Sequence, residues 1–342
     1  MTGPGKTLEI RSSPHFLSGN SVDQIMFQVV LALLPTSAFA VYAFGLTAVA
    51  MLVVAVLATV LTEHLLCIAS KKPTTVGDWS AVITGLLYGL TLPPGLALWM
   101  VAIGGVIAIV LGKAVFGGLG YNPFNPALAG RAVLQAAFPV ALTTWPLVLA
   151  PGRFTTLPGS LLTLPFTTPH YDAVSGATPL SAWKFDRQIA ATSDLVLGFT
   201  SGSLGETCAV LILLGGIYLA ARRMLNWRIP VVILATVALF SGILHASNPE
   251  RFAGPLFHLF SGGLMLGAVF MATDMVGSPM TNLGCAVYGV LIGFLVVLIR
   301  VFGGMPEGVM YAILLGNALV PHIDRLVRPR VYGTTGKKGA AA

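Results

Sequence analysis

A short polar segment near the middle of the chain carries the residues best suited to covalent chemistry. It reads TTPHYDAVSGATPLSAW over residues 167–183. Ser175, Gly176 and Ala177 form a small, flexible approach to the hydroxyl of Thr178, and a proline sets the direction of the chain just beyond it. The pattern predicts a threonine that a modifying enzyme can reach. An ordinary surface turn has the same kind of composition, so the spacing alone does not separate the two interpretations.

Two acidic residues close to apolar runs form a second candidate site. Burying an ionisable group in a membrane is costly, so such a residue is a functional candidate by default. Glu63 and Asp274 meet this criterion. They could line an ion path, or they could pair with Lys71, Lys72 or a nearby arginine, and we favour the pairing. The cysteines show no CxxC spacing and the histidines no i, i+4 pair, so no metal or iron–sulfur site is expected.

The elements that must position these residues are membrane helices. Of 342 residues, 56% are hydrophobic and 9% are charged, whereas soluble domains use about a quarter of their residues for Asp, Glu, Lys and Arg. A span needs roughly 20 apolar residues, and long and interrupted apolar runs together predict about ten spans in an all-α integral membrane protein. The long runs are Ile25 to Phe44, Leu46 to Ala69, Leu96 to Phe116, Pro126 to Ala150, Thr207 to Ala221, Ile229 to His245, Leu283 to Ile299 and Val309 to Val320, and the interrupted ones are Ala81 to Leu92 and Leu256 to Ala272.

The distribution of Lys and Arg predicts how the chain is oriented. If the amino terminus is cytoplasmic, 14 of the 19 basic residues fall inside. The residues that fall outside are Arg153, Lys184, Arg187, Arg251 and Arg300. The positive-inside rule then places both termini in the cytoplasm of a bacterial cell, with an even number of crossings of the inner membrane. The net charge of +7 is therefore read as a membrane signal, and no nucleic-acid partner is expected.

The chain also resembles itself, which predicts two halves. VFGG occurs at residues 115–118 and again at 301–304, and the same offset of 186 aligns LAGRAV with LLGNAL downstream. Five spans are an odd number, so a five-span repeat must be inverted, and such folds bind ligands where the repeats meet. The interrupted segments around Pro93 and Asp274 point to that site. The alternative is a chance match between glycine-rich helices, since glycine pairs are also wanted for close helix packing.

These predictions divide the chain into five segments. They are a cytoplasmic segment (1–24), a first five-span repeat (25–150), a periplasmic loop with the candidate threonine (151–205), a second five-span repeat (206–325) and a cytoplasmic tail (326–342).

Three motifs carry a resemblance to a known family. They are SGAT at residues 175–178, GYNPFNPALAGRA at 120–132 and MATDMVGSPMTN at 271–282. The chain resembles the family that includes the D subunit of the Rnf ion-translocating oxidoreductase and the B subunit of the sodium-pumping NADH:quinone reductase, over essentially its whole length. The resemblance implies FMN joined to Thr178 through a phosphoester, installed by a flavin transferase that recognises Asp172. The length and the short amino-terminal region favour the Rnf protein, although Met275 stands where the family has proline.

The resemblance also implies a second, noncovalent flavin, either riboflavin or FMN, in the membrane part. Asn122, Phe124 and Asn125 are candidates for its pocket, because irregular backbone at membrane depth is tolerated where it is buried or lines a cavity. An equally good interpretation is a helix capped by asparagine after a proline break. Near the first flavin, Trp183 is a candidate for stacking, although packing within the loop is the commoner role of such a residue.

The function implied by the resemblance is electron transfer within a membrane complex. The complex would couple electron flow between ferredoxin and NAD to the movement of Na⁺ or H⁺. The implied partners are membrane subunits, a periplasmic-facing FMN subunit, and cytoplasmic iron–sulfur and NADH/flavin subunits. Two alternatives stay open. The quinone-reductase protein would reduce quinone, and a solute channel or transporter would hold no flavin.

Overall fold

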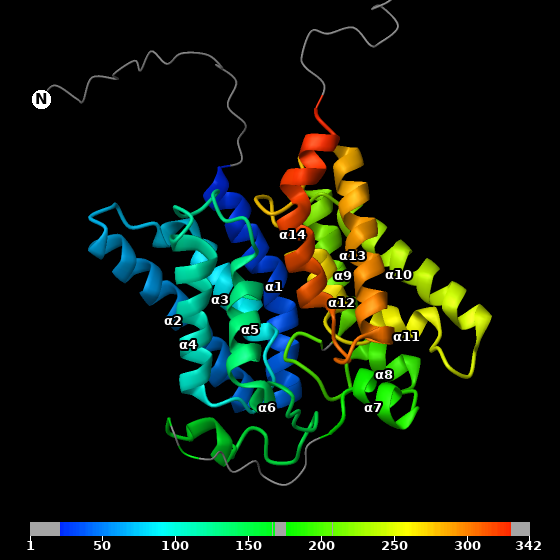
Figure 1. Ribbon diagram of the computed structural model, residues 1–342. Coiled ribbons are helices and arrows are strands. Elements are labelled where there is room, and N and C mark those ends of the chain that lie inside the picture. Colours follow the sequence, from blue (N-terminus) through cyan, green and yellow to red (C-terminus); the bar gives the residue numbers. More distant parts are fainter. Residues whose placement is uncertain (1–20, 166, 168–175, 207, 330–342) are drawn as a thin grey trace, which may run out of the picture.

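The computed structural model describes residues 21–165, 167, 176–206 and 208–329 (Figure 1). These residues form helices joined by turns, without a strand, so the all-α prediction is confirmed for this part of the chain. The α-helices are α1 (Val22–Phe44), α2 (Leu46–Ala69), α3 (Ser80–Leu90), α4 (Leu98–Ile109), α5 (Pro126–Ala137), α6 (Pro139–Leu142), α7 (Pro179–Asp186), α8 (Thr192–Leu197), α9 (Ala209–Ala221), α10 (Arg228–Ser247), α11 (Pro255–Phe260), α12 (Leu264–Leu266), α13 (Asn282–Phe302) and α14 (Val309–Leu326). Short 3₁₀ helices are η1 (Val76–Asp78) and η3 (Gly159–Leu162), and π-helical turns are η2 (Val110–Ala114) and η4 (Gly267–Met271).

In the described part of the chain, four helices are long and apolar enough to cross a membrane, namely α1, α2, α10 and α13. Their outward faces are also apolar. On α2, Leu57, Leu61 and Leu65 lie one turn apart and are 52%, 55% and 62% exposed. A ridge of exposed leucines would be unfavourable in water and is the expected surface of a helix in lipid. The fold is that of a membrane protein.

Several predicted spans are shorter or broken in the structure. Leu98–Ala114 (α4 with η2) and α9 are apolar but shorter, and the two runs predicted to be interrupted are indeed short or broken. The apolar run from Pro126 to Ala150, predicted as one span, is not one continuous helix. The α-helix ends at Ala137, because the residue before a proline is disfavoured in the helical conformation and Phe138 precedes Pro139.

The helices form two groups, α1 to α5 and α9 to α14, which lie side by side (Figure 1). In the first group α2 packs on α3 and α4, and in the second α10 packs on α11 and α13. Glycines bring the helices together. A Cβ atom on Gly85 would lie 2.7 Å from the Val56 backbone, and one on Gly293 would lie 2.7 Å from the Thr236 side chain. The predicted role of glycine in close helix packing is confirmed at these two positions.

The two edges of the helix bundle differ. The start of α1 and the end of α14 lie at one edge, and α6, α7 and α8 lie at the other (Figure 1). At that second edge, a hydrogen bond joins the turn between α1 and α2 to the loop after α6: the Leu46 N–H donates to the Arg153 carbonyl at 2.9 Å. This relative arrangement matches the one predicted from the basic residues. The sorting counted Lys113 and Arg131 on the cytoplasmic side and Arg300 on the opposite side, however, and the structure buries all three within the protein.

Candidate functional site

Thr178 lies at the start of α7 and caps that helix. Its Oγ1 accepts a hydrogen bond from the Ser181 N–H at 3.2 Å and donates one to the Ser181 hydroxyl at 3.1 Å. Pro179 occupies the first helical position, where its missing N–H is not needed. The helix that follows the motif therefore begins at a defined point. The residues predicted to approach the threonine and to be recognised by the transferase, Ser175 and Asp172, lie outside the described residues.

The structure corrects the predicted accessibility of Thr178. The residue is 2% exposed, and the approach to it is packed. The Gly176 N–H donates to the Trp145 carbonyl at 2.8 Å, and a Cβ atom on Gly176 would lie 2.6 Å from the Ser201 hydroxyl. Ala177 is exposed, but its neighbours on both sides are held. Thr178 is buried because α7 docks on the second helix group, a contact that no local sequence pattern encodes.

A cavity of about 480 Å³ lies next to Thr178, and we call it the Thr178 pocket. Its lining comes from both helix groups: Arg131 of α5, Thr178 and Ser181 of α7, Ser203 before α9 and Glu307 before α14. The volume lies in the range of small-molecule sites, about 300–1,000 Å³.

Charged groups surround the Thr178 pocket. Arg131 donates to the Glu307 carboxylate at 2.9 Å, and Glu206 lies within electrostatic reach of both. Three buried polar atoms of this cluster, Arg131 Nε, Glu206 Oε1 and Glu307 Oε1, have no partner among the described residues. Buried polar groups are normally hydrogen-bonded. The pocket can therefore accept a ligand that carries several polar groups.

Lys184 fastens α7 to the segment that carries Glu307. Its Nζ donates to the carbonyls of Arg300, Gly303 and Met305 at 3.2, 2.5 and 3.0 Å. Burial of the ammonium lowers the pKa of Lys184 from its usual value. On the neighbouring face of α7, the Trp183 ring packs edge-on against the His258 ring at 5.3 Å. Trp183 is thus a packing residue of α7 in this structure.

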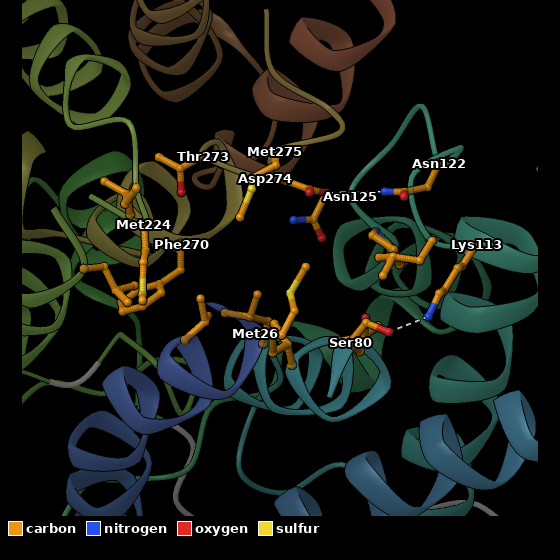
Figure 2. A pocket seen from close by; sticks show the side chains of 18 residues that line it. Met26, Ser80, Lys113, Asn122, Asn125, Met224, Phe270, Thr273, Asp274 and Met275 are labelled. Carbon is orange, nitrogen blue, oxygen red and sulfur yellow. Dashed lines mark hydrogen bonds between the residues drawn. The ribbon is translucent and has the colours of Figure 1, made fainter. Parts of the chain in front are cut away.

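A second cavity, of about 100 Å³, lies between the two helix groups (Figure 2). We call it the Asn125 pocket. Asn125 Oδ1 caps α5 by accepting from Ala127 N–H at 3.0 Å, and Asn125 Nδ2 donates to the Met271 carbonyl at 3.2 Å. The capping interpretation of this motif is therefore confirmed. The side chain also bridges the two halves of the chain.

The other predicted residues of this pocket differ in position. Asn122 lines the Asn125 pocket and donates to the Asp274 carboxylate at 3.4 Å, so two motifs 152 residues apart meet here (Figure 2). Phe124 does not line it; its ring lies against Phe116, with centroids 6.5 Å apart.

Glu63 forms a buried ion pair, but its partner differs from the predicted ones. Lys113 Nζ lies 2.8 and 2.9 Å from the two carboxylate oxygens of Glu63, and both side chains are 6% exposed. The prediction of pairing is confirmed for Glu63, and the choice of Lys71 or Lys72 is wrong. Those lysines lie on the exposed turn after α2, whereas Lys113 lies on η2, which packs against α2, and its side chain meets the carboxylate in the buried space between them. For Asp274, the described residues show hydrogen bonds from Asn122 and the Val276 N–H in place of an ion pair.

The comparison with known proteins decides the family. The sequence matches the NQR2, RnfD, RnfE family over residues 9–333. The chain belongs to this family. It is 42% identical, over 95% of its length and 96% of the relative's, to the D subunit of the proton-translocating ferredoxin:NAD(+) oxidoreductase complex of Clostridium ljungdahlii. It is 40% identical to the D subunit of the Na(+)-translocating ferredoxin:NAD(+) oxidoreductase complex of Acetobacterium woodii, over 98% of each chain. It is also 40% identical to the D subunit of an ion-translocating oxidoreductase complex of Halorhodospira halophila, over 96% of each chain.

For this member of the family, sequence reasoning missed three charged residues that line the two pockets, Lys113, Arg131 and Glu307. It also missed Glu206, which lies within electrostatic reach of Arg131 and Glu307. Two of these residues left a signal in the sequence. Lys113 interrupts the apolar run from Leu96 to Phe116 and Arg131 the run from Pro126 to Ala150, and an ionisable group inside a span is a functional candidate. Glu206 and Glu307 flank apolar runs, where a loop residue and a buried one look alike in sequence.

Proposed function

We propose that the chain is the flavin-carrying electron-transfer protein, equivalent to the D subunit of its relatives, in a membrane complex that couples electron flow between ferredoxin and NAD to translocation of Na⁺ or H⁺. The observation that carries this proposal is the identity of about 40% over nearly the whole chain to relatives named in this way. The partners would be the other subunits of the complex, including a periplasmic-facing FMN subunit and cytoplasmic iron–sulfur and NADH/flavin subunits.

The architecture we propose has ten membrane segments arranged as two inverted five-segment repeats. It is supported by the internal sequence match and by the equivalent packing of α2 on α4 and of α10 on α13. Both chain ends would lie in the cytoplasm of a bacterial cell, with the edge formed by α6, α7 and α8 at the periplasmic face of the inner membrane. The distribution of basic residues supports this orientation.

FMN would be esterified through its phosphate to the Thr178 hydroxyl, after a flavin transferase recognises the segment around Asp172. The residues present fit such a group. Thr178 lines a cavity of about 480 Å³, and that cavity is bordered by polar atoms that lack partners among the described residues. The Arg131 guanidinium would balance negative charge in the pocket, and its hydrogen bond to Glu307 holds the guanidinium in position. Bound flavin supplies one- and two-electron chemistry, which the side chains here do not offer.

A second, noncovalent flavin, riboflavin or FMN, would occupy the Asn125 pocket. Asn122, Asn125 and Asp274 supply amide and carboxylate groups at its wall. The cavity of about 100 Å³ is smaller than usual ligand sites, so side chains must move to admit a ring. Three lining residues are methionines, Met26, Met224 and Met275, whose flexible side chains can rearrange at low cost.

The test of the main proposal is mass spectrometry of the protein purified from cells that contain the flavin transferase. We expect the mass of the wild-type chain to exceed that of the bare chain by one esterified FMN, and Thr178→Ala to abolish the increment. Ser181→Ala is the matched control, because it alters the same helix start and keeps the Thr178 hydroxyl. A wild-type chain without the increment would refute the FMN proposal.

The alternatives make different predictions. A B subunit of the sodium-pumping quinone reductase would support quinone reduction when assembled with its partners, and a flavin-free channel would transport solute as an isolated chain. Purification with the partner proteins, followed by assays with ferredoxin and with quinone, separates the three functions.

A further inference from the structure

A lysine ammonium occupies a cage of oxygen atoms where α2, α3 and η2 meet. Lys113 Nζ lies 2.8 and 2.9 Å from the Glu63 carboxylate oxygens and 2.5 Å from the Ser80 hydroxyl. The Thr75 hydroxyl donates to the same carboxylate. Carboxylate and hydroxyl oxygens are also the ligands that hard metal cations prefer. The ammonium thus sits where a metal cation of one positive charge would find the same ligands.

The cage lies between an exposed turn and a buried pocket. Thr75 and the residues just before it are exposed, whereas Glu63 and Lys113 are buried. On the inner side, Lys113 and Ser80 also line the Asn125 pocket, with Asp274 at its far wall (Figure 2). The ammonium therefore has two environments within reach, the cage and the pocket.

The backbone that carries Lys113 is fixed by packing, so a movement of the ammonium has to come from rotation of the side chain. Lys113 lies in a π-helical turn, a feature found frequently at functional sites. The turn packs tightly on α5, since a Cβ atom on Gly112 would lie 2.6 Å from the Pro126 backbone. Lysine has a flexible four-carbon stem with a compact charge at its end. A rotation of the stem can move the ammonium without a backbone shift.

We infer that Lys113 is a tethered cation that competes with a monovalent metal cation of the Na⁺ type for the cage of Glu63, Ser80 and Thr75. The ammonium leaves the cage when the Asn125 pocket gains negative charge. The competition between the Lys113 ammonium and the metal cation is inferred from the cage alone. The event that moves the ammonium out of the cage rests on the proposed second flavin.

The charges balance at each stage. An electron delivered by the redox partners of the complex adds one negative charge to the Asn125 pocket, and the Lys113 ammonium moves there to compensate it. One metal cation then enters the cage from the exposed turn and compensates the Glu63 carboxylate. When the electron leaves, the ammonium returns and displaces the cation. A membrane interior strongly favours this pairing of every charge.

The competition is tested by Na⁺ binding to the oxidised, purified complex. NaCl is titrated at constant ionic strength against choline chloride, and binding is followed by calorimetry and by the Na⁺ dependence of the unfolding temperature. We expect Lys113→Met to bind Na⁺ at least about tenfold more tightly than the wild type, because the competitor no longer occupies the site. Lys113→Arg keeps the charge and should stay weak. Lys71→Met, on the exposed turn, should behave as the wild type.

Three results would overturn the inference. The first is equal Na⁺ affinity in Lys113→Met and the wild type. The second is tight Na⁺ binding that survives in the double variant Glu63→Gln/Lys113→Met. The third is a Lys113→Met variant that binds protons more tightly than the wild type but Na⁺ no more tightly. If Lys113→Met folds poorly, Na⁺ should restore its unfolding temperature, and a failure to do so also counts against the cage.

The trigger has a separate test. Reducing the wild-type complex with dithionite should tighten Na⁺ binding and leave Lys113→Met unchanged. Acid extraction measures the noncovalent flavin in the same sample. If that flavin is missing, the second-flavin proposal fails, while tighter Na⁺ binding by oxidised Lys113→Met still supports the competition.

Discussion

Arg131 and Glu307 are 176 residues apart in sequence, and their charged groups meet at 2.9 Å beside Thr178. Arg131 belongs to α5 and Glu307 to the segment before α14, so the pair joins the two helix groups at the wall of the Thr178 pocket. It holds the groups together where the proposed flavin would sit.

We predict that removing one partner of this pair costs more than removing both. Glu307→Gln leaves the buried Arg131 guanidinium without the carboxylate it is paired with, and only the more distant Glu206 remains to compensate it, whereas a double variant removes both members of the pair. The expected coupling between Arg131→Met and Glu307→Gln is about 1–3 kcal/mol. Unfolding of the wild type and the three variants in detergent, followed by intrinsic fluorescence, measures it. Additive effects would show that the pair contributes no interaction energy.

Lys184→Met should loosen α7. The substitution keeps the length of the side chain but removes three hydrogen bonds from an ammonium to carbonyls, and bonds to charged groups contribute about 1.5–3 kcal/mol each. We expect faster hydrogen exchange in α7 and higher mobility of a flavin attached at Thr178, measured by fluorescence anisotropy. Lys184→Arg is the charge-retaining control. Unchanged exchange in α7 would mean that Trp183 and its neighbours hold the helix without Lys184.

The burial of Thr178 predicts that the transferase acts before α7 docks. The folded apo protein should be modified slowly, and Trp183→Ala should accelerate the modification by weakening the packing of α7 on His258. The measurement is the rate of FMN incorporation into purified apo protein supplied with the transferase. Asp186 is exposed on the same helix and does not line the Thr178 pocket, so Asp186→Ala is a suitable control. Equal rates for the wild type and Trp183→Ala would show that docking does not limit access.

Gly45→Ala should be far more disruptive than Gly118→Ala. Both glycines have positive φ angles, 67° and 111°, so both substitutions carry conformational strain. Only Gly45 is also confined, because a Cβ atom there would lie 2.0 Å from the Arg153 carbonyl oxygen, whereas Gly118 has open space. The unfolding temperature of each variant tests this. Similar losses would indicate that strain alone, and not the contact with Arg153, sets the cost.

The sequence by itself determined the features that depend on neighbours along the chain. Apolar runs predicted most helices because the tendency to enter lipid is a sum over adjacent residues. The NPFNP motif offered an asparagine cap as one of two interpretations, and a cap can be recognised in sequence because it is satisfied within the next three residues. The SGAT motif marked Thr178 through a family resemblance that needs no coordinates.

Only the tertiary structure decided which distant groups meet. It paired Glu63 with Lys113 rather than with the lysines nearer in sequence, placed Asn122 beside Asp274, and buried Thr178 at the start of α7. These outcomes depend on which helices cross and at what depth, and those crossings are set by packing across the whole bundle. A charge beside an apolar run is compatible with either an exposed turn or a buried pair, and the energy that separates the two comes from residues far away in the sequence.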